Sequence, residues 1–224
     1  DVCSSDLKIK VDYRPFIHVE GLTAKEVRAQ KIDFSRFHNI VLTSRNAVDH
    51  FFRITEEMRF KVPDQTKYFC QSEAVAYYLQ KYVVYRKRKI YVGNNSFRDL
   101  EATFVKFHKE NFLVPSSGSL NPDIANTLDS FDISWQRAQL FKTVVSDLSD
   151  LSDVYYDVLV FFSPLGIESL FENFPDFKQN KTLIAVYGNT TEDAAIGKNL
   201  RIDIKAPTEV SPSMAMAIER YIKG

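Results

Sequence analysis

The sequence is poor in cysteine: Cys3 and Cys70 are the only two among 224 residues. Two cysteines do not make the disulfide framework of a small secreted domain, and no Cys/His spacing resembles a zinc site. No apolar stretch approaches the roughly 20 residues that a membrane-spanning helix requires. These absences exclude a disulfide scaffold, a zinc module and a membrane span, and they predict a soluble protein of a reducing compartment, the cytoplasm.

Net charge is also lacking, because 29 Lys and Arg balance 29 Asp and Glu. No global field therefore recruits nucleic acid or another polyanion. The hydrophobic share is 45%, with 18 Phe and 11 Tyr, which favours a packed globule over a disordered chain. A chain of 224 residues can form one large domain or two small ones, with ample core.

The motifs of common catalytic chemistry are missing as well. There is no GxGxxG motif, and the segment at Gly188 is not a P-loop because it lacks the lysine and the spacing. The histidines lie in unrelated contexts, and we interpret each as a structural or surface residue: His18, His38, His50 and His108. An enzyme with this sequence would have to act by positioning and electrostatics more than through a reactive side chain.

What the sequence does contain is a repeated pattern of apolar strand, polar cap and helix. The continuous apolar run at residues 158–162 predicts a strand covered on both faces, and Ser163 and Pro164 suit the cap and first turn of a helix. Alternation of this kind predicts a doubly wound α/β fold, and its repetition predicts two like domains. The pattern occurs in the segments 39–52, 67–74, 158–170 and 182–195.

The remaining segments complete this prediction. We expect strands at residues 8–14 and 134–145, and a final helix capped by residues 211–213. The basic run at residues 85–89 is either an edge strand blunted by Lys and Arg or a patch for acidic ligand groups. Residues 1–7 have no apolar period and resemble a translated sequencing adapter, so we expect them to be an artefact and exclude them from the fold.

Helix starts at strand ends are the candidate functional positions. Free N–H groups and the positive end of the helix dipole make each start a ready anion site, although any one cap can also be simply a cap. Ligands of doubly wound sheets bind at the carboxyl ends of the strands. If these caps line one cleft between two domains, they predict a multiply anionic small molecule held by backbone amides. The caps are Ser44, Ser72, Asn121, Ser163 and Thr190, with Ser211 as a further cap.

Several short motifs follow one another in a fixed order along residues 8–224. They are Thr43-Ser44-x-x-Ala47-Val48, Leu113-Val114-Pro115 before Asn121, Phe141-x-Thr143, Phe161-Phe162-Ser163-Pro164-x-Gly166, Gly188-x-Thr190-Thr191-x-x-Ala194, and Ala206-Pro207 through Ser211-Pro212. Each motif is weak alone, but the ordered set resembles the uroporphyrinogen-III synthase family.

The resemblance implies two α/β domains, flavodoxin-like halves with doubly wound parallel sheets, joined by a two-stranded linker. One domain would be discontinuous, formed by residues 8–19 and 146–224, with its first strand and helix missing. The other would be an insertion at residues 20–140, with linkers near residues 15–21 and 138–147.

The resemblance also implies a reaction. A lyase of this family closes linear hydroxymethylbilane to uroporphyrinogen III, with loss of water and inversion of the last pyrrole ring, in haem and sirohaem biosynthesis. The outline is loss of the hydroxyl to an azafulvene, attack through a spiro intermediate, and ring closure. No metal or cofactor takes part, and the many carboxylates of this linear tetrapyrrole would suit helix-start anion sites. We expect a cytoplasmic monomer that binds neither nucleic acid nor membrane.

Site residues carry over from the family with two departures. Phe141 stands where the family usually has a Tyr, the favoured donor to the leaving hydroxyl, so Thr190, Thr191 or a bound water would replace it. Glu73 stands in a turn that often reads Gly-x-x-Thr-Ala, and its carboxylate would repel a substrate carboxylate unless it points away. The expected substrate-binding residues are Thr43, Ser44, Ser72, Ala74, Asn121, Ser163, Gly166, Gly188 and Asn189.

Two other functions stay open at this point. One is a non-catalytic relative that binds a tetrapyrrole or another polyanion without turning it over. The other is a two-domain sugar- or phosphate-binding module with the same architecture, because fold does not imply function.

Overall fold

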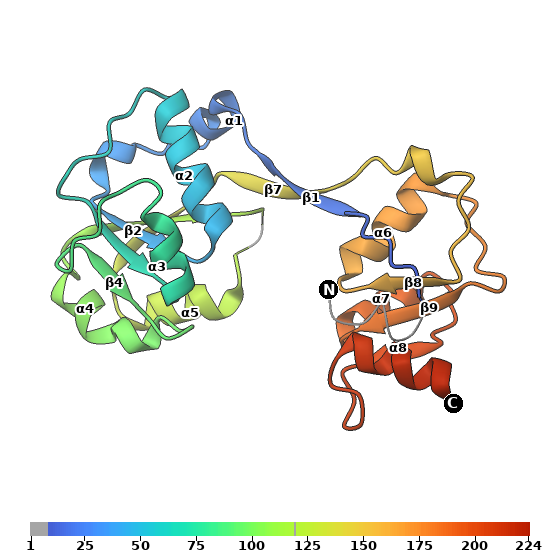
Figure 1. Ribbon diagram of the computed structural model, residues 1–224. Coiled ribbons are helices and arrows are strands. Elements are labelled where there is room, and N and C mark those ends of the chain that lie inside the picture. Colours follow the sequence, from blue (N-terminus) through green and yellow to red (C-terminus); the bar gives the residue numbers. More distant parts are fainter. Residues whose placement is uncertain (1–8, 119) are drawn as a thin grey trace. The chain divides into compact units, whose positions relative to one another are not determined.

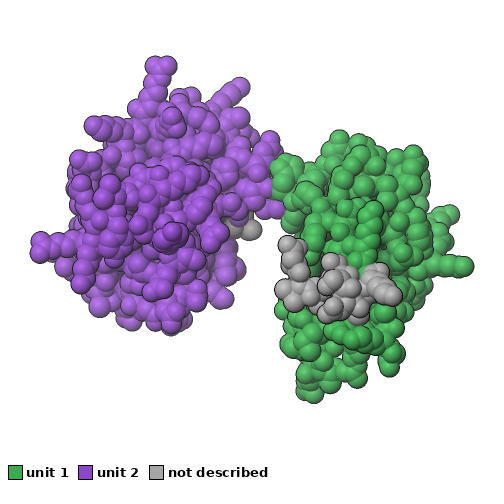
Figure 2. All heavy atoms as spheres, in the orientation of Figure 1, with its two compact units in different colours: residues 1–18, 144–224 green, residues 19–143 purple. Residues whose placement is uncertain are grey.

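The computed structural model describes residues 9–118 and 120–224. Their chain divides into two compact units, which Figure 2 shows in different colours. Unit 1 contains the chain up to His18 together with residues 144–224, and unit 2 contains residues 19–143. The expectation about residues 1–7 falls outside the described part of the chain.

Unit 2 is built on a parallel sheet of five strands in the order β4-β3-β2-β5-β6. The central strand β2 is buried at every position, and Asn39 at its start lies opposite Lys67 and Phe112 of the neighbouring strands. The strands are β2 (Asn39–Leu42), β3 (Lys67–Cys70), β4 (Ile90–Val92), β5 (Asn111–Ser116) and β6 (Ser134–Gln139).

Helices cover both faces of this sheet (Figure 1). Successive side chains of a strand point to opposite faces, and in β2 Ile40 and Leu42 enter one apolar cluster while Val41 enters another. The first cluster includes Phe51 of α2, and the second includes Phe104 of α4. The helices are α1 (Ala24–Ala29), α2 (Arg45–Glu57), α3 (Glu73–Leu79), α4 (Glu101–Lys106) and α5 (Pro122–Ser130), with 3₁₀ turns η1 (Phe34–Arg36) and η2 (Arg98–Leu100).

Unit 1 repeats this plan on a parallel sheet of three strands in the order β10-β9-β8. In the central strand, Ile184 and Val186 pack into one apolar cluster and Ala185 into a second, so this sheet also has two covered faces. The strands are β8 (Val158–Phe161), β9 (Leu183–Tyr187) and β10 (Ile204–Ala206), and the helices are α6 (Pro164–Asn173), α7 (Asn189–Gly197) and α8 (Met214–Lys223), with a 3₁₀ turn η3 (Ser149–Leu151). Together with the five-stranded sheet, this arrangement confirms the predicted doubly wound α/β fold class.

A two-stranded sheet of β1 (Ile17–Gly21) and β7 (Phe141–Val145) carries the chain across the boundary of the units in both directions. The backbone N–H of Leu22 donates to the carbonyl of Leu140, and that of Ser146 donates to the carbonyl of Phe16. Residue numbers therefore rise along one strand while those of their partners fall along the other, so the two strands run antiparallel. They form the expected two-stranded linker.

Three sequence expectations about the elements were wrong. Residues 9–14 pair with no strand of the described chain and so form none; their contacts are made by side chains, as in the pairing of Arg14 with Asp150 at 2.6 Å. The single strand expected at residues 134–145 is split at Leu140, whose N–H donates to Ser116 while its carbonyl accepts from Leu22. Residues 158–162 are not covered throughout, because β8 is an edge of its sheet and Phe162 is 65% exposed.

Candidate functional site

Three helix starts lie at one edge of the five-stranded sheet. Ser44, Ser72 and Asn121 follow β2, β3 and β5, and because these strands are parallel, their carboxyl ends meet at that edge. Each residue is an N-cap whose side-chain oxygen accepts a bond from the first turn of its helix, at 3.1 Å from Ala47 for Ser44 and 2.9 Å from Asp123 for Asn121. The predicted caps are therefore confirmed, and other first-turn amides are left without an intrahelical partner.

The corresponding edge of unit 1 has one capped helix start and one without a side-chain cap. Ser163 follows β8 and accepts from the N–H of Gly166 at 3.3 Å. Gly166 is buried, and a Cβ there would lie 3.4 Å from the ring of Phe161, so this glycine allows α6 to pack closely on the strand. Its role is visible as packing; any contact with a ligand stays a prediction.

The prediction that Thr190 caps α7 was wrong. The N-cap is Gly188, with φ +83°, and it offers no side-chain acceptor to the helix that begins at Asn189. A residue with a side chain rarely adopts this backbone conformation, so the turn starts the helix earlier than the threonine pair suggested. The amides of the first turn of α7 consequently lack a side-chain partner. That this start binds an anion stays a prediction.

The two threonines expected near the chemistry differ in accessibility. Thr190 is exposed, whereas Thr191 is 1% exposed and packs inside unit 1. Among the expected ligand-binding residues, Asn189 and Ala74 are exposed and Thr43 is half-buried, whereas Gly166 is buried. Of the two threonines, only Thr190 can present its hydroxyl to a bound molecule. Ser211 does not cap the last helix either: Ser213 does, because Ser211 is buried in a turn with Thr208.

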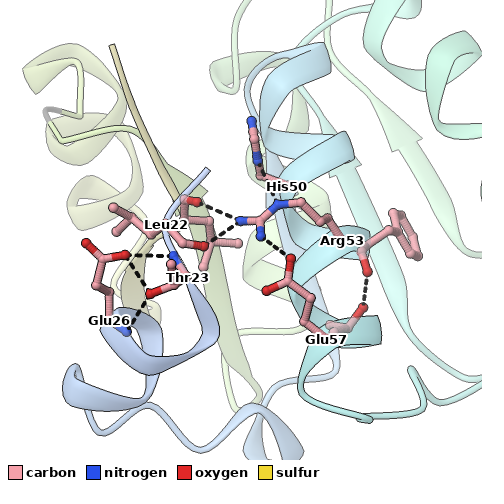
Figure 3. Close-up of polar contacts among 9 residues, drawn as sticks. Leu22, Thr23, Glu26, His50, Arg53 and Glu57 are labelled. Carbon is pink, nitrogen blue, oxygen red and sulfur yellow. Dashed lines mark hydrogen bonds and ion pairs between the residues drawn. The ribbon is translucent and has the colours of Figure 1, made fainter. Parts of the chain in front are cut away.

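Phe141, the residue in place of the family Tyr, is 6% exposed and stacks on His50, with ring centroids 5.0 Å apart. His50 lies on α2 and accepts a hydrogen bond at Nδ1 from Nε of Arg53 at 3.1 Å, so its ring proton sits on Nε2 (Figure 3). Burial lowers the pKa of His50, and the charge of Arg53 lowers it further. The sequence interpretation treated His50 as an ordinary structural residue; the signal that could have singled it out is a long-range contact with position 141, which spacing does not encode.

Arg53 ties α2 to the linker strands at the point where both enter unit 2. Its guanidinium donates to the carbonyls of Leu22 at 2.8 Å and Leu140 at 3.3 Å, and pairs with Glu57 at 2.5 Å (Figure 3). A Cβ on Gly21 would lie 2.7 Å from this guanidinium. The glycine therefore lets Arg53 lie against the backbone of the linker, where it also fixes His50 beneath Phe141.

Cations missed by the sequence reasoning also lie at the carboxyl edge of unit 2. Arg45, directly after the cap Ser44, is exposed, has no ion pair among the described residues, and lies 5.6 Å from the centre of the Tyr78 ring. Arg137 on β6 donates to the hydroxyl of Ser116 at 2.8 Å and so holds the loop before Asn121. The sequence did contain a signal for Arg45, because this cation directly follows a predicted helix cap.

Two side chains at this edge limit the chemistry. Burial raises the pKa of the Cys70 thiol to about 12, so Cys70 is no nucleophile at neutral pH. Glu73 is exposed in the first turn of α3, where its negative charge stabilises the helix.

Residues 9–118 and 120–224 hold no group of three His, Cys, Asp or Glu side chains suited to a metal ion. The longest helix of the described chain, α2, has 13 residues, too few to span a bilayer.

Comparison with known proteins decides the family. The model of the family described as uroporphyrinogen-III synthase HemD matches residues 5–215. The chain belongs to this family. A search of curated protein sequences gives no match.

One solved structure supports the fold. The crystal structure of uroporphyrinogen-III synthetase from Helicobacter pylori is 16% identical, with a TM-score of 0.59 over 93% of this chain and 90% of that one. A mutant uroporphyrinogen III synthase from Thermus thermophilus is 15% identical, with a TM-score of 0.47 over 93% of this chain and 88% of that one. At this identity the first likeness speaks for the two-domain fold alone.

Proposed function

We propose that this chain is a uroporphyrinogen-III synthase, which closes linear hydroxymethylbilane with loss of water and inversion of the last pyrrole ring. The observation that carries the proposal is membership of the family over residues 5–215. The helix starts at the carboxyl edges of both sheets support it, because the substrate carries carboxylates and such starts bind anions through backbone amides.

In this reaction the hydroxyl leaves as water after accepting a proton, and the resulting azafulvene carbon is attacked by the last pyrrole ring. The attack forms a spiro carbon, and the bond from this carbon to its original methylene bridge then breaks. That methylene bonds to the other α-carbon of the ring, which inverts the ring, and loss of the proton from this carbon restores the aromatic pyrrole. We assign to the protein the task of holding the curled chain so that attack occurs at the substituted carbon. This is catalysis by positioning, which needs no reactive side chain.

Phe141 cannot donate to the leaving hydroxyl. Among the described side chains Thr190 is exposed and able to do so, and Nε2–H of His50, beside Phe141, is a second donor. Thr191 is the weaker of the predicted substitutes because it is buried. We propose Thr190, His50 or a bound water as the group that assists departure of the hydroxyl.

Substrate binding is assigned to the helix starts and to the exposed cation beside them. In unit 2 we propose the first turns after Ser44, Ser72 and Asn121, with Arg45 as a charged partner. In unit 1 we propose the start of α7 at Gly188 together with that of α6 at Ser163. Action of these two groups on one substrate, a monomeric state and a cytoplasmic location stay predictions.

The test is the isomer of the product. Freshly made hydroxymethylbilane closes spontaneously to the type I ring, so chromatography of the oxidised products separates catalysis from background. We expect type III in excess over type I with the protein present. Binding of hydroxymethylbilane with only type I product would instead favour the non-catalytic tetrapyrrole-binding relative, for which the loss of the family Tyr at Phe141 is the specific argument.

A further inference from the structure

Unit 2 has a pocket at the amino-terminal ends of β3 and β4, the edge opposite its helix starts. Its volume is about 490 Å³, within the range of small-molecule sites. The C-terminal half of α2, the loop at residues 60–66 and the segment 82–90 form its walls. Nothing in the proposed synthase reaction uses this edge of the sheet.

Aromatic rings dominate the walls of this pocket. Phe52 and Tyr82 stack on each other with centroids 4.5 Å apart and an interplanar angle of 5°, and Tyr68 lies 6.2 Å from Phe52. Phe60 and Ile90 add further apolar surface. Flat apolar walls of this kind suit a flat apolar ligand, since ring faces offer a large contact area.

An accessible hydroxyl without a protein partner lies in this apolar wall. Thr66 lines the pocket, but its Oγ1, which has no hydrogen-bond partner among the described residues, is shielded from solvent. Tyr68, 5% exposed, lines the same pocket, and no described residue bonds its hydroxyl. Polar side-chain atoms with so little exposure nearly always have a partner, so the Tyr68 hydroxyl is available to a ligand atom. Burial raises the pKa of Tyr68, so this hydroxyl stays protonated and able to donate.

Two residues of the basic run at 85–89 lie at the edge of this pocket. The N–H of Lys89 donates to the carbonyl of Arg86 at 2.8 Å, and this turn places Arg86 and Lys89, but not Lys87 or Arg88, in the pocket lining. The ammonium of Lys89 is bonded to the carbonyl of Asp64. Arg86 has neither an ion pair nor a side-chain hydrogen bond within the described chain, so its guanidinium is available to a ligand.

The charges around the pocket limit the ligand to few negative charges. Glu56 and Asp64 also line it, and both are exposed. Two carboxylates balance the two cations, so a multiply anionic molecule gains nothing there. The free capacity of Tyr68 and Arg86 includes a donor on each side chain, which suits a group that accepts several hydrogen bonds.

We propose that this pocket is a second binding site, for a planar aromatic monocarboxylate. The ring system lies against Phe52 and Tyr82, and the carboxylate accepts hydrogen bonds from the Tyr68 hydroxyl and Arg86. This site is independent of the proposed synthase reaction. The proposal favours the second interpretation of the basic run, a patch for acidic ligand groups, because Arg86 would bind the carboxylate of the ligand.

The experiment measures binding of 2-naphthoate to the full chain by calorimetry, with 2-naphthylmethylammonium as a probe of reversed charge. We expect 2-naphthoate to bind and the ammonium probe to bind at least about tenfold more weakly, the ratio that corresponds to one charge-assisted hydrogen bond. Equal binding of both probes, or no binding of 2-naphthoate at millimolar concentration, would overturn the proposal.

Three variants locate the bound probe. Arg86→Met should weaken binding of 2-naphthoate about tenfold, whereas Arg88→Met, a matched control from the same basic run outside the pocket, should leave it unchanged. Tyr68→Phe, which keeps the ring and removes the hydroxyl donor, should also weaken binding. The proposal fails if Arg88→Met weakens binding as much as Arg86→Met, or if Tyr68→Phe leaves binding unchanged.

Discussion

The two units share one plan and differ in how their helix starts are finished. In unit 2, Ser44, Ser72 and Asn121 each cap a helix with a side-chain oxygen. In unit 1, the start of α7 at Gly188 has no such cap. A side-chain cap accepts a hydrogen bond from one of the first-turn N–H groups, which an anion would otherwise bind. From this difference we expect the stronger amide-based anion site in unit 1, whereas Phe141, which stands in place of the family Tyr, and His50 lie in unit 2.

Phe141→Tyr tests the contribution proposed for unit 2, assistance to departure of the hydroxyl, and has the largest expected effect. If a phenol at this position assists departure of the hydroxyl, general acid assistance is worth about 10²–10⁴-fold, and the labile leaving group places the gain at the low end, about 100-fold. Turnover should rise while the type III fraction stays unchanged. The rate of substrate consumption and the isomer ratio are measured together. A changed isomer ratio at unchanged rate would mean that position 141 shapes the substrate and does not assist departure.

Thr190→Glu tests the contribution proposed for unit 1, binding of a substrate carboxylate at the start of α7. A carboxylate in the first turn of α7 occupies the open anion site and repels the substrate, so formation of type III should fall about tenfold, the value of one charge-assisted hydrogen bond. The same charge stabilises the helix by about 0.3–1 kcal/mol, so unfolding cannot explain the loss. Thr191→Glu is unsuitable because Thr191 is buried.

A matched control for this charge is Ile196→Glu, at an exposed position in the last turn of the same helix. It should leave the isomer ratio and the rate close to those of the parent protein. Equal losses in the two variants would show that the added charge acts on the whole unit and not on the helix start.

Two glycines, one from each unit, are compared for their effect on stability. Gly21 allows a side chain to lie close to the backbone, whereas Gly197 only lowers the helix propensity of its segment. Gly21→Ala pushes the guanidinium of Arg53 from the carbonyls of Leu22 and Leu140, so the free energy of unfolding should fall by about 1–2 kcal/mol. Gly197→Ala meets no atom within 4 Å in a helix, and should raise it by about 0.5–1 kcal/mol. Denaturant unfolding measures both, and a gain in the first variant would contradict the role given to Arg53.

The smallest expected effect concerns the protonation of His50. Its pKa lies below 6.5 in the folded protein, mainly because of burial, whereas the unfolded chain takes up the proton near 6.5. The unfolded state thus binds more protons in that window, so the contribution of His50 to stability is complete above 6.5 and is lost as pH falls. His50→Gln should reduce the loss of stability between about pH 7.5 and about pH 5.5, and His108→Gln, at an exposed position, should not. A titration of the His50 ring with a pKa above 6.5 would contradict the account.

Local signals predicted much of the fold. Apolar runs ending in a cap located β2, β3, β8 and β9, and the caps Ser44, Ser72, Asn121 and Ser163 were predicted because their bonds stay within one helical turn. The start of α7 was missed by two residues, because the backbone angle of Gly188 decided it and two threonines obscured it.

Features that depend on distant contacts could not be predicted. The stacking of His50 on Phe141 and the bonds of Arg53 to Leu22 and Leu140 join segments far apart in the sequence. The half-buried state of β8 follows from its place at a sheet edge, which an apolar run does not reveal. The unpaired hydroxyl of Thr66 likewise becomes visible only when three segments surround it.

The most direct test of the central claim is the type III fraction as a function of protein concentration, at a fixed amount of fresh hydroxymethylbilane. If the chain is a synthase, the fraction should rise with protein from the spontaneous mixture toward type III alone, and a heat-denatured sample should give no rise. A product that stays type I at every protein concentration, with consumption at the spontaneous rate, would contradict the account.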